Sequence, residues 1–183
     1  VARRSRQAFH ARPVSGVALP AVLLMGPTAS GKSALALALA ERFAAEIVSV
    51  DSALVYRGMD VGTAKPDAAA RRRVPHHLID IADPGTEFNV YQFQSLCFAA
   101  LEDIQSRNKT PIICGGTGLY LDSVLQGYRL IHVPENPQLR DELSFSSDYQ
   151  LQQKLLALKP EQHNQTDLFD RDRLLRAIEI ALG

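Results

Sequence analysis

Eight residues near the start of the chain have the types and spacing of a phosphate-binding loop. Residues 26–33 fit the pattern G-x-x-x-x-G-K-[ST], whose glycines let the backbone wrap around an anion. The N–H groups of such a loop, and of the helix after it, direct partial positive charge at that anion. Lys32 adds a full positive charge, and the hydroxyl of Ser33 suits Mg²⁺, the expected cofactor. The predicted ligands of a diphosphate, triphosphate or pyrophosphate are Gly26, Pro27, Thr28, Ala29, Ser30, Gly31, Lys32 and Ser33, with Ser33 also the metal ligand.

The elements around this loop must hold it in place. The apolar run at 21–25 predicts a strand before the loop, and the Ala- and Leu-rich run at 34–43 predicts a helix after it. A second buried strand is predicted at 46–51, ending on Asp51. Parallel α/β sheets carry their chemistry at the carboxyl ends of strands, so topology makes Asp51 a candidate site residue. The alternative interpretation is a turn or helix-capping aspartate.

A second glycine-rich turn follows another predicted strand. The apolar segment 111–114 leads into residues 115–120, which open a predicted helix at 119–126. A tight turn between a strand and a helix requires glycines in any case. If the strands are parallel, however, this turn and the phosphate-binding loop converge on one crevice.

A histidine pair, His76 and His77, precedes a short strand predicted at 78–81. Adjacent residues at the mouth of a strand point to opposite faces, and no Cys or Glu completes a tetrahedral set. Packing or hydrogen-bonding histidines are therefore favoured over zinc ligands.

The pattern predicts an α/β core followed by a small helical lobe. Helices are expected at 67–73, 89–105, 138–143, 149–159 and 170–182. We predict a basic extension at 1–18, a core of mainly parallel strands at 19–130 and a helical segment at 131–183. The extension is interpreted as disordered, with a transit peptide as the alternative.

Composition limits the possible partners. Lys and Arg number 20, as do Asp and Glu, so nucleic-acid binding would require local basic patches such as 71–73 and 171–176. No apolar run approaches the roughly 20 residues of a membrane span. Cys97 and Cys114 lie in apolar surroundings, which favours buried free thiols in a reducing cytosol over a disulfide.

Taken together, the motifs resemble those of the tRNA dimethylallyltransferases, also called isopentenyl-diphosphate:tRNA isopentenyltransferases. The matching segments are 26–33, 50–66, 76–80, 115–120 and 170–179. The segment at 50–66, Val-Asp-Ser-Ala-Leu-Val-Tyr-Arg-Gly-Met-Asp-Val-Gly-Thr-Ala-Lys-Pro, is the longest and most specific. The resemblance implies a P-loop NTPase-like core.

The family is a class of prenyltransferases that modify tRNA. Its members move a dimethylallyl group from dimethylallyl diphosphate to N6 of adenosine 37 in tRNAs that read codons beginning with U. The resemblance implies that residues 26–33 hold the pyrophosphate of the prenyl donor rather than ATP. It also implies a cytoplasmic, monomeric enzyme whose partner is the tRNA anticodon stem-loop. Members continue past the helix at 170–182, so segments completing the diphosphate and tRNA clamp are expected beyond this sequence.

Site residues follow from the resemblance position by position. Asp51 is similar to the general base that accepts the N6 proton, and Thr117 to the threonine that meets the substrate. Arg140 matches a basic residue near the RNA. The implied tRNA-binding residues are Asp51, Ser52, Ala53, Leu54, Thr117, Arg140, Asp172, Arg173, Leu174, Leu175 and Arg176.

Other functions remain open at this point. A P-loop kinase would share the loop, the magnesium and the sheet, but would bind ATP. An adenylate isopentenyltransferase would prenylate free AMP or a larger adenine nucleotide. A non-enzymatic binding module would hold phosphate without turnover.

Overall fold

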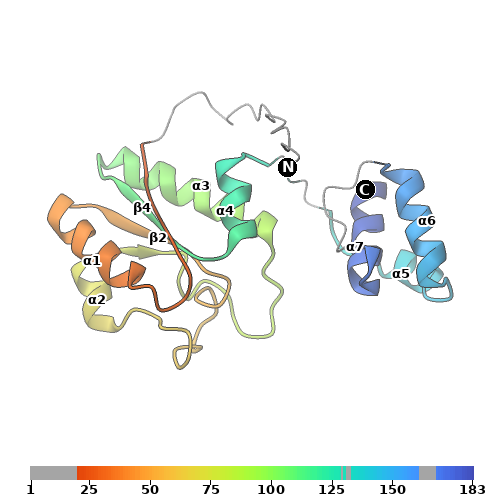
Figure 1. Cartoon of the computed structure of the whole chain (residues 1–183), viewed down its shortest axis with the longest axis horizontal. Coiled ribbons are helices and arrows are strands. Elements are labelled where there is room, and N and C mark those ends of the chain that lie inside the picture. The colour runs from red at the N-terminus through yellow and green to blue at the C-terminus, as the bar shows by residue number, and fades with distance from the viewer. Residues whose placement is uncertain (1–19, 129, 131–132, 161–167) are drawn as a thin grey trace, which may run out of the picture. The chain divides into compact units, whose positions relative to one another are not determined.

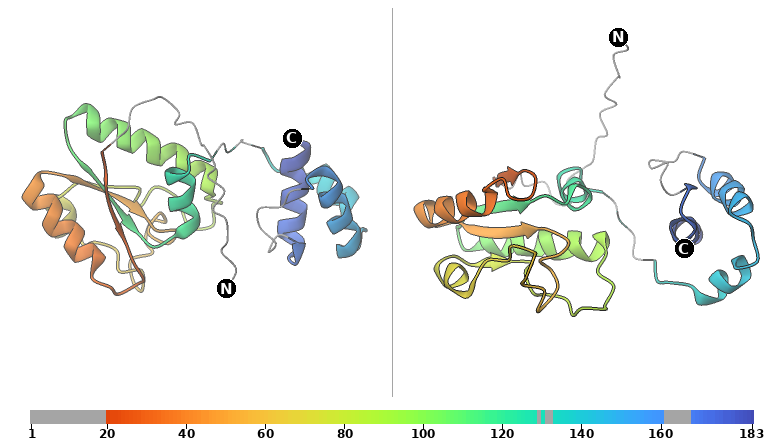
Figure 2. Two further views of the ribbon diagram at one scale, coloured as in Figure 1. Left: turned by 45° about the horizontal axis from the view of Figure 1, so that its top comes forward. Right: turned by 60° about the horizontal axis from the view of Figure 1, so that its bottom comes forward.

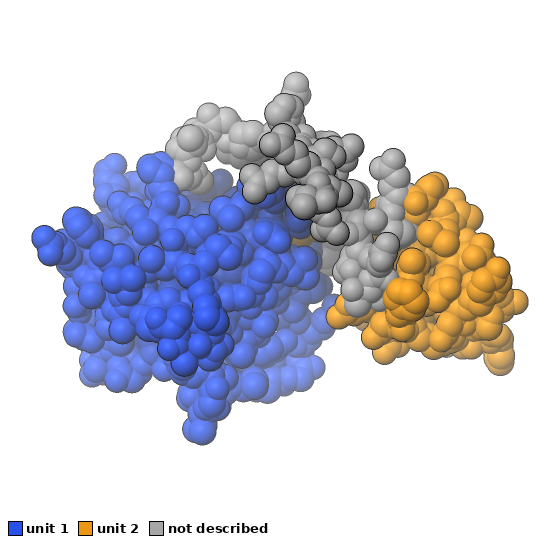
Figure 3. Space-filling model, viewed as in Figure 1, with its two compact units in different colours: residues 1–129 blue, residues 130–183 orange. Residues whose placement is uncertain are grey.

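The structure, a computed structural model, describes residues 20–128, 130, 133–160 and 168–183 (Figure 1). Two compact units make up the chain, residues 1–129 and 130–183, coloured blue and orange in Figure 3. The boundary expected from the sequence lies between residues 130 and 131. The basic extension predicted at 1–18 falls outside the described residues. None of the helices in the described ranges is both long enough and apolar enough to span a membrane.

Unit 1 is built on a four-stranded parallel sheet. Its strands are β1 (Val22–Met25), β2 (Glu46–Val50), β3 (His76–His77) and β4 (Pro111–Gly115), in the spatial order β1-β4-β2-β3. Every pairing in this sheet is parallel. The mainly parallel α/β architecture predicted from the sequence is therefore confirmed.

Helices cover both faces of this sheet. They are α1 (Lys32–Phe43), α2 (Ala68–Arg73), α3 (Val90–Ser106) and α4 (Gly118–Leu125). Figure 2 shows α1 and α3 on opposite faces of β2. Asn89 begins α3 with a capping box, because its side chain accepts from the Gln92 N–H while the Gln92 side chain accepts from the Asn89 N–H.

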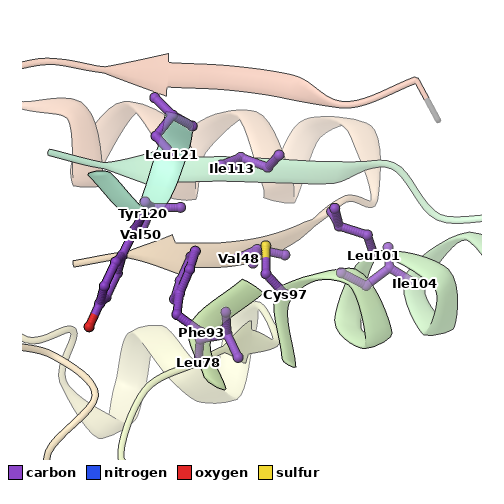
Figure 4. Close-up of a cluster of buried hydrophobic side chains, with 10 residues drawn as sticks. All are labelled: Val48, Val50, Leu78, Phe93, Cys97, Leu101, Ile104, Ile113, Tyr120 and Leu121. Carbon is purple, nitrogen blue, oxygen red and sulfur yellow. The ribbon is translucent and has the colours of Figure 1, made fainter. Parts of the chain in front are cut away.

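Successive side chains of β2 point to opposite faces of the sheet and therefore pack against different helices. Val48 and Val50 face α3 and α4, whereas Ile47 belongs to the cluster beneath α1. Figure 4 shows the first cluster, in which Phe93 stacks on Tyr120 with ring centroids 4.2 Å apart. Strands β2 and β4 are buried along their whole length, as expected for parallel strands covered on both faces, whereas the edge strand β1 is largely exposed, with Met25 56% exposed.

The strand predicted at 78–81 is wrong. The strand consists of His76 and His77, and the backbone then turns, with φ of 62° at Leu78 and 57° at Asp80. Positive φ values are incompatible with a strand. The chain leaves the sheet here because its N–H groups bond to the loop after β2, where Leu54 O accepts from the Asp80 N–H at 3.1 Å.

Both histidines make hydrogen bonds. His76 Nδ1 lies 2.8 Å from Val74 O, and His77 Nε2 lies 2.7 Å from Glu46 Oε2. The Glu46 carboxylate is 5% exposed and also binds the Arg107 guanidinium. Hydrogen bonding by Arg107 is the largest influence on Glu46 and holds the pKa of this carboxyl below its usual value, although burial opposes the effect.

Both cysteines are buried free thiols, as their apolar neighbourhoods predicted. Burial raises the pKa of Cys97 to about 12, and burial also raises the pKa of Cys114. Both thiols are therefore protonated at neutral pH.

Unit 2 is helical. It contains α5 (Pro137–Leu143), α6 (Asp148–Leu158) and α7 (Arg171–Leu182). Its buried core consists of Leu143, Leu151, Leu155, Leu174, Leu175 and Ile178. Ser147 caps α6 with a capping box, and the Asp170 side chain caps α7 by accepting from the Arg173 N–H.

Gly115 should tolerate no side chain. A Cβ at this position would lie 2.0 Å from Val50 O in the paired strand β2. We expect Gly115→Ala to destabilise unit 1 by about 2 kcal/mol or more, since the strands must separate to relieve the overlap. Urea unfolding followed by circular dichroism measures the change.

Gly118→Ala is the matched control, because a Cβ there meets nothing within 4 Å. Gly118 is the first residue of α4, where alanine is favoured over glycine, so this variant should be as stable as the wild type or slightly more stable. Equal stability of the two variants would contradict the predicted close approach.

Candidate functional site

Three loops meet at the carboxyl edge of the sheet. They follow β1, β2 and β4, and begin at Gly26, Asp51 and Gly116. The N–H groups of Gly116 and Thr117 both donate to Val50 O, at 3.1 and 3.2 Å. A Cβ on Gly116 would lie 3.2 Å from Gly26 O, so the first and third loops also approach closely. The convergence expected of parallel strands is therefore present.

Residues 26–33, the predicted phosphate-binding loop, connect β1 to α1. Ala29 and Gly31 have φ values of 64° and 83°, and α1 begins at Lys32. Lys32 and Ser33 thus occupy the first helical turn, two residues earlier than the sequence predicted. N–H groups of a first turn have no intrahelical acceptor, so they are available to an anion. Lys32 Nζ donates to Pro27 O at 3.0 Å, which folds the ammonium back over the loop.

Asp51 lies at the carboxyl end of β2, as predicted, although the strand ends at Val50, one residue earlier than expected. Its Oδ1 accepts from the Ala53 N–H at 2.9 Å, which makes a turn of the kind that aspartates commonly form. The side chain is half-buried, and Oδ2 takes no part in this turn. Asp51 therefore has the hydrogen bond of a turn aspartate, and its second carboxylate oxygen stays outside that turn at the carboxyl edge of the sheet.

Thr117 joins the second loop to the third. Its Oγ1 accepts from the Ser52 N–H at 3.0 Å, and its hydroxyl lies 3.5 Å from Ser52 Oγ. Thr117 is also the N-cap residue of α4, but its side chain makes no capping hydrogen bond. The hydroxyl thus fixes the position of the Asp51 loop relative to the glycine-rich turn.

The sequence interpretation missed Ser49. This residue of β2 is 3% exposed, and within the described ranges its Oγ has no hydrogen-bond partner. It lies two residues before Asp51, on the same face of the strand as Ile47. The period of two would have placed Ser49 beneath α1, but nothing in the sequence marks its hydroxyl as unpartnered.

The basic patch at 71–73 is mostly paired. Arg71 Nη1 binds Asp80 Oδ2 at 2.5 Å, and Arg73 binds Glu41 at 3.1 Å. Arg72 is exposed. Arg71 and Arg73 therefore make ion pairs within unit 1, and the Arg73 side chain stays 57% exposed in its pair. Binding of a polyanion at residues 71–73 stays a prediction.

Two predicted RNA-binding arginines of unit 2 surround a buried carboxylate. Glu179 is 1% exposed and receives Arg140 Nε at 2.7 Å, Arg176 Nη1 at 3.0 Å and the Asn136 N–H at 3.0 Å. Arg176 also donates to Val133 O at 2.7 Å. Arg140 thus joins α5 to α7, and Arg176 joins α7 to the segment before α5. The single negative charge of Glu179 is shared between the two guanidiniums.

The remaining predicted RNA contacts of unit 2 divide by burial. Asp172 and Arg173 are exposed on α7. Leu174 is 1% exposed and Leu175 is 9% exposed, because both side chains pack in the helical core. These two leucine side chains therefore hold α7 in the helical core, and contact between the 172–176 stretch and RNA stays a prediction.

Two family models match this chain. The model described as Isopentenyl transferase matches residues 20–79, and the model described as IPP transferase matches residues 54–183. The chain belongs to the IPP transferase family. The resemblance inferred from the motifs is thereby confirmed. The match at residues 54–183 covers the rest of the loop that begins at Asp51 and the whole of unit 2.

Curated relatives agree with this assignment. The chain is 55% identical over 158 residues to tRNA dimethylallyltransferase 2 of Trichlorobacter lovleyi, an alignment that covers 86% of this chain and 52% of that protein. It is 56% identical over 162 residues to tRNA dimethylallyltransferase 2 of Syntrophotalea carbinolica, covering 88% and 54%. The chain spans about half the length of these relatives.

Solved structures resemble the fold. A full-length tRNA isopentenylpyrophosphate transferase from Bacillus halodurans is 36% identical, with a TM-score of 0.60, 88% of this chain covered and 55% of that one. A eukaryotic dimethylallyltransferase acting on tRNA is 27% identical, with a TM-score of 0.72 and coverage of 88% and 41%.

Glu179 should stabilise unit 2 in a pH-dependent way. Hydrogen bonding by Arg140 is the main cause that lowers the pKa of Glu179 from 4.5 to about 2. A depressed carboxyl pKa stabilises the fold above pH 4.5, and this contribution, about 3 kcal/mol, is lost as the pH falls toward 2. We expect Glu179→Gln to unfold at lower urea than wild type at pH 7, and the difference to shrink on acidification.

The exposed Asp172→Asn in the same helix is the control and should follow the wild type at every pH. Loss of helical circular dichroism in urea at pH 7, 4 and 2.5 reports the result. A pH-independent gap between wild type and Glu179→Gln would contradict the assigned ion pair.

Proposed function

We propose that this protein transfers a dimethylallyl group from dimethylallyl diphosphate to N6 of adenosine 37 in tRNAs that read codons beginning with U. The observation that carries the proposal is the convergence of the Asp51 loop and the phosphate-binding loop in a member of the IPP transferase family. The named relatives, which are tRNA dimethylallyltransferases, support the acceptor.

The diphosphate of the donor would bind at residues 26–33. The first-turn N–H groups of α1 and the Lys32 ammonium supply positive charge where the leaving pyrophosphate develops negative charge. Ser33, exposed in the same turn, would hold Mg²⁺ through its hydroxyl together with phosphate oxygens. The bound magnesium would neutralise charge on the diphosphate.

Asp51 would act as the general base. The adenine N6 attacks the C1 carbon of the prenyl group, the C1–O bond breaks, and the electron pair leaves with pyrophosphate. The proton lost from N6 passes to Asp51, whose Oδ1 is already held by the Ala53 N–H. The adenosine must leave its base stack to reach this edge of the sheet.

The tRNA would meet the exposed surface near these loops. Ser52 is exposed beside Asp51, and Thr117 fixes that loop from the neighbouring turn. Arg173 and Asp172 offer exposed polar groups on α7. Arg140 and Arg176 would act by holding unit 2 together around Glu179.

A transfer assay tests the proposal. Labelled dimethylallyl diphosphate and Mg²⁺ are mixed with an unmodified anticodon stem-loop carrying A36-A37-A38, and Asp51→Asn is compared with the wild type. Because removal of a general base costs about 10²- to 10⁴-fold, we expect label to enter the wild-type RNA and transfer by the variant to fall by that factor. Diphosphate affinity should persist in the variant.

Asp103→Asn is the matched control, since Asp103 is an exposed carboxylate of α3 that pairs with Arg107 at the other edge of the sheet. Its transfer rate should equal that of the wild type. Label entering only AMP, offered in parallel, would identify an adenylate isopentenyltransferase. Phosphate transfer from ATP, with no prenyl transfer, would identify a kinase.

A further inference from the structure

A buried lysine closes the long motif at 50–66. The Lys65 side chain is 1% exposed, although the loop that carries it lies at the surface. Its ammonium is 2.8 Å from Asp60 Oδ1, 2.7 Å from Asp80 Oδ1 and 2.8 Å from Tyr56 O. An ammonium has three donors, so Lys65 meets three acceptors and is fully satisfied.

Asp80 completes this cluster from the motif at 76–80. One carboxylate oxygen binds Lys65, and the other accepts from Arg71, whose Nε also donates to Pro66 O at 2.8 Å. The Asp80 side chain is 28% exposed. Residues from the loop after β2, from α2 and from the segment after β3 therefore share one ionic cluster.

The same cluster holds the backbone next to Asp51. Leu54 O accepts from the Asp80 N–H at 3.1 Å, and Val55 O accepts from the Ile81 N–H at 2.8 Å. Tyr56 O accepts from Lys65. Three successive carbonyls, only three to five residues after Asp51, are thus bound by the Lys65 and Asp80 segments.

We propose that Lys65 and Asp80 are positioning residues for Asp51: they fix the 51–56 loop so that the carboxylate stands where the acceptor nitrogen is deprotonated. The inference rests on the proposed function. Neither side chain touches the substrate in this role. Lys65 acts through its hydrogen bond to Tyr56 O, and the Asp80 segment acts through the hydrogen bond of its N–H to Leu54 O. Both bonds hold the backbone that follows the turn between Asp51 and Ala53.

Packing alone does not account for a charged residue at this position. Burying an ammonium costs free energy unless every donor is paired, and a methionine fills similar volume without that cost. The ammonium, unlike a methionine, reaches a backbone carbonyl and two carboxylates at once. These three bonds to one ammonium specify a single conformation of the loop. Catalysis requires such precision, because displacing a catalytic group by about 1 Å costs about 10²-fold in rate.

Both groups keep their charge at neutral pH. Burial acts to lower the pKa of Lys65, but hydrogen bonds to Asp60 and Asp80 outweigh it, and the pKa is raised. Burial acts to raise the pKa of Asp80, but hydrogen bonds from Lys65 and Arg71 outweigh it, and the pKa is lowered. The cluster therefore persists across the pH range of an assay near neutrality.

The test compares Lys65→Met and Asp80→Asn with Glu46→Gln in the intact protein. Glu46 belongs to an ionic cluster at the amino edge of the sheet, so its substitution removes a buried charge without altering the Asp51 loop. For each variant, kcat and KM for dimethylallyl diphosphate are measured with the anticodon stem-loop as acceptor. Thermal unfolding and hydrogen exchange of the Ala53, Arg57 and Ile81 amides are measured alongside.

We expect Lys65→Met and Asp80→Asn to lower kcat about 10- to 100-fold with KM for the diphosphate within about twofold of the wild type. Amide exchange in the loop should accelerate. Glu46→Gln should lose thermal stability yet keep kcat and loop protection within about twofold. If Lys65→Met does not fold, the nearly isosteric Asp80→Asn decides.

Two results would overturn the inference. One is an unchanged kcat in a folded Lys65 or Asp80 variant, and the other is a kcat loss that Glu46→Gln shares at equal loss of stability. If the wild type transfers no prenyl group, the proposed function fails, but the exchange measurement still decides whether Lys65 orders the loop. Protection lost in the Lys65 variant and kept in Glu46→Gln supports the ordering, and protection kept in both refutes it.

Discussion

The close approach of β4 to the end of β2 is the constraint on which the candidate site depends. Gly115 leaves room for Val50 O, and that carbonyl then accepts from both Gly116 and Thr117. This contact brings the glycine-rich turn against the Asp51 loop, where Thr117 binds the Ser52 N–H. A side chain at Gly115 would separate the two strands, so the geometry of the site requires a glycine at this position.

Ionic clusters with buried members hold the structure around that constraint. Lys65 gathers two carboxylates and a carbonyl behind the Asp51 loop, Glu46 gathers Arg107 and His77 at the opposite edge, and Glu179 gathers two arginines in unit 2. Buried charges are tolerated when their partners satisfy them, and a satisfied cluster specifies one arrangement of the segments it joins. Some of the charged side chains of this chain, whose formal net charge is 0, are therefore committed to internal contacts.

This use of charge changes how the basic residues relate to a nucleic acid. From the sequence, a dispersed surface that binds a polyanion could include Arg71, Arg140 and Arg176. In the folded chain, each of these arginines binds an acidic side chain. Arg173 keeps its exposure on α7. In the proposed reaction, recognition of tRNA would rest on exposed backbone and side chains near the Asp51 loop as much as on arginines, because a guanidinium that already binds a carboxylate gains less free energy on meeting phosphate.

The sequence alone determined the parallel α/β core, the strand, glycine-containing loop and helix at residues 22–43, the place of Asp51 at the carboxyl end of a strand, and the family. These features depend on local patterns: the periodicity of apolar residues, the spacing of glycines and the order of strand, loop and helix. Residues close together in the sequence are enough to define such patterns. Only the tertiary structure decided that β3 stops at His77, that Leu174 and Leu175 face a core, and that Lys65 is buried against Asp80. Ion pairs and buried faces join residues that are far apart in the chain. A charged residue in the sequence indicates that a partner is needed if it is buried, but only the fold decides which residue that partner is.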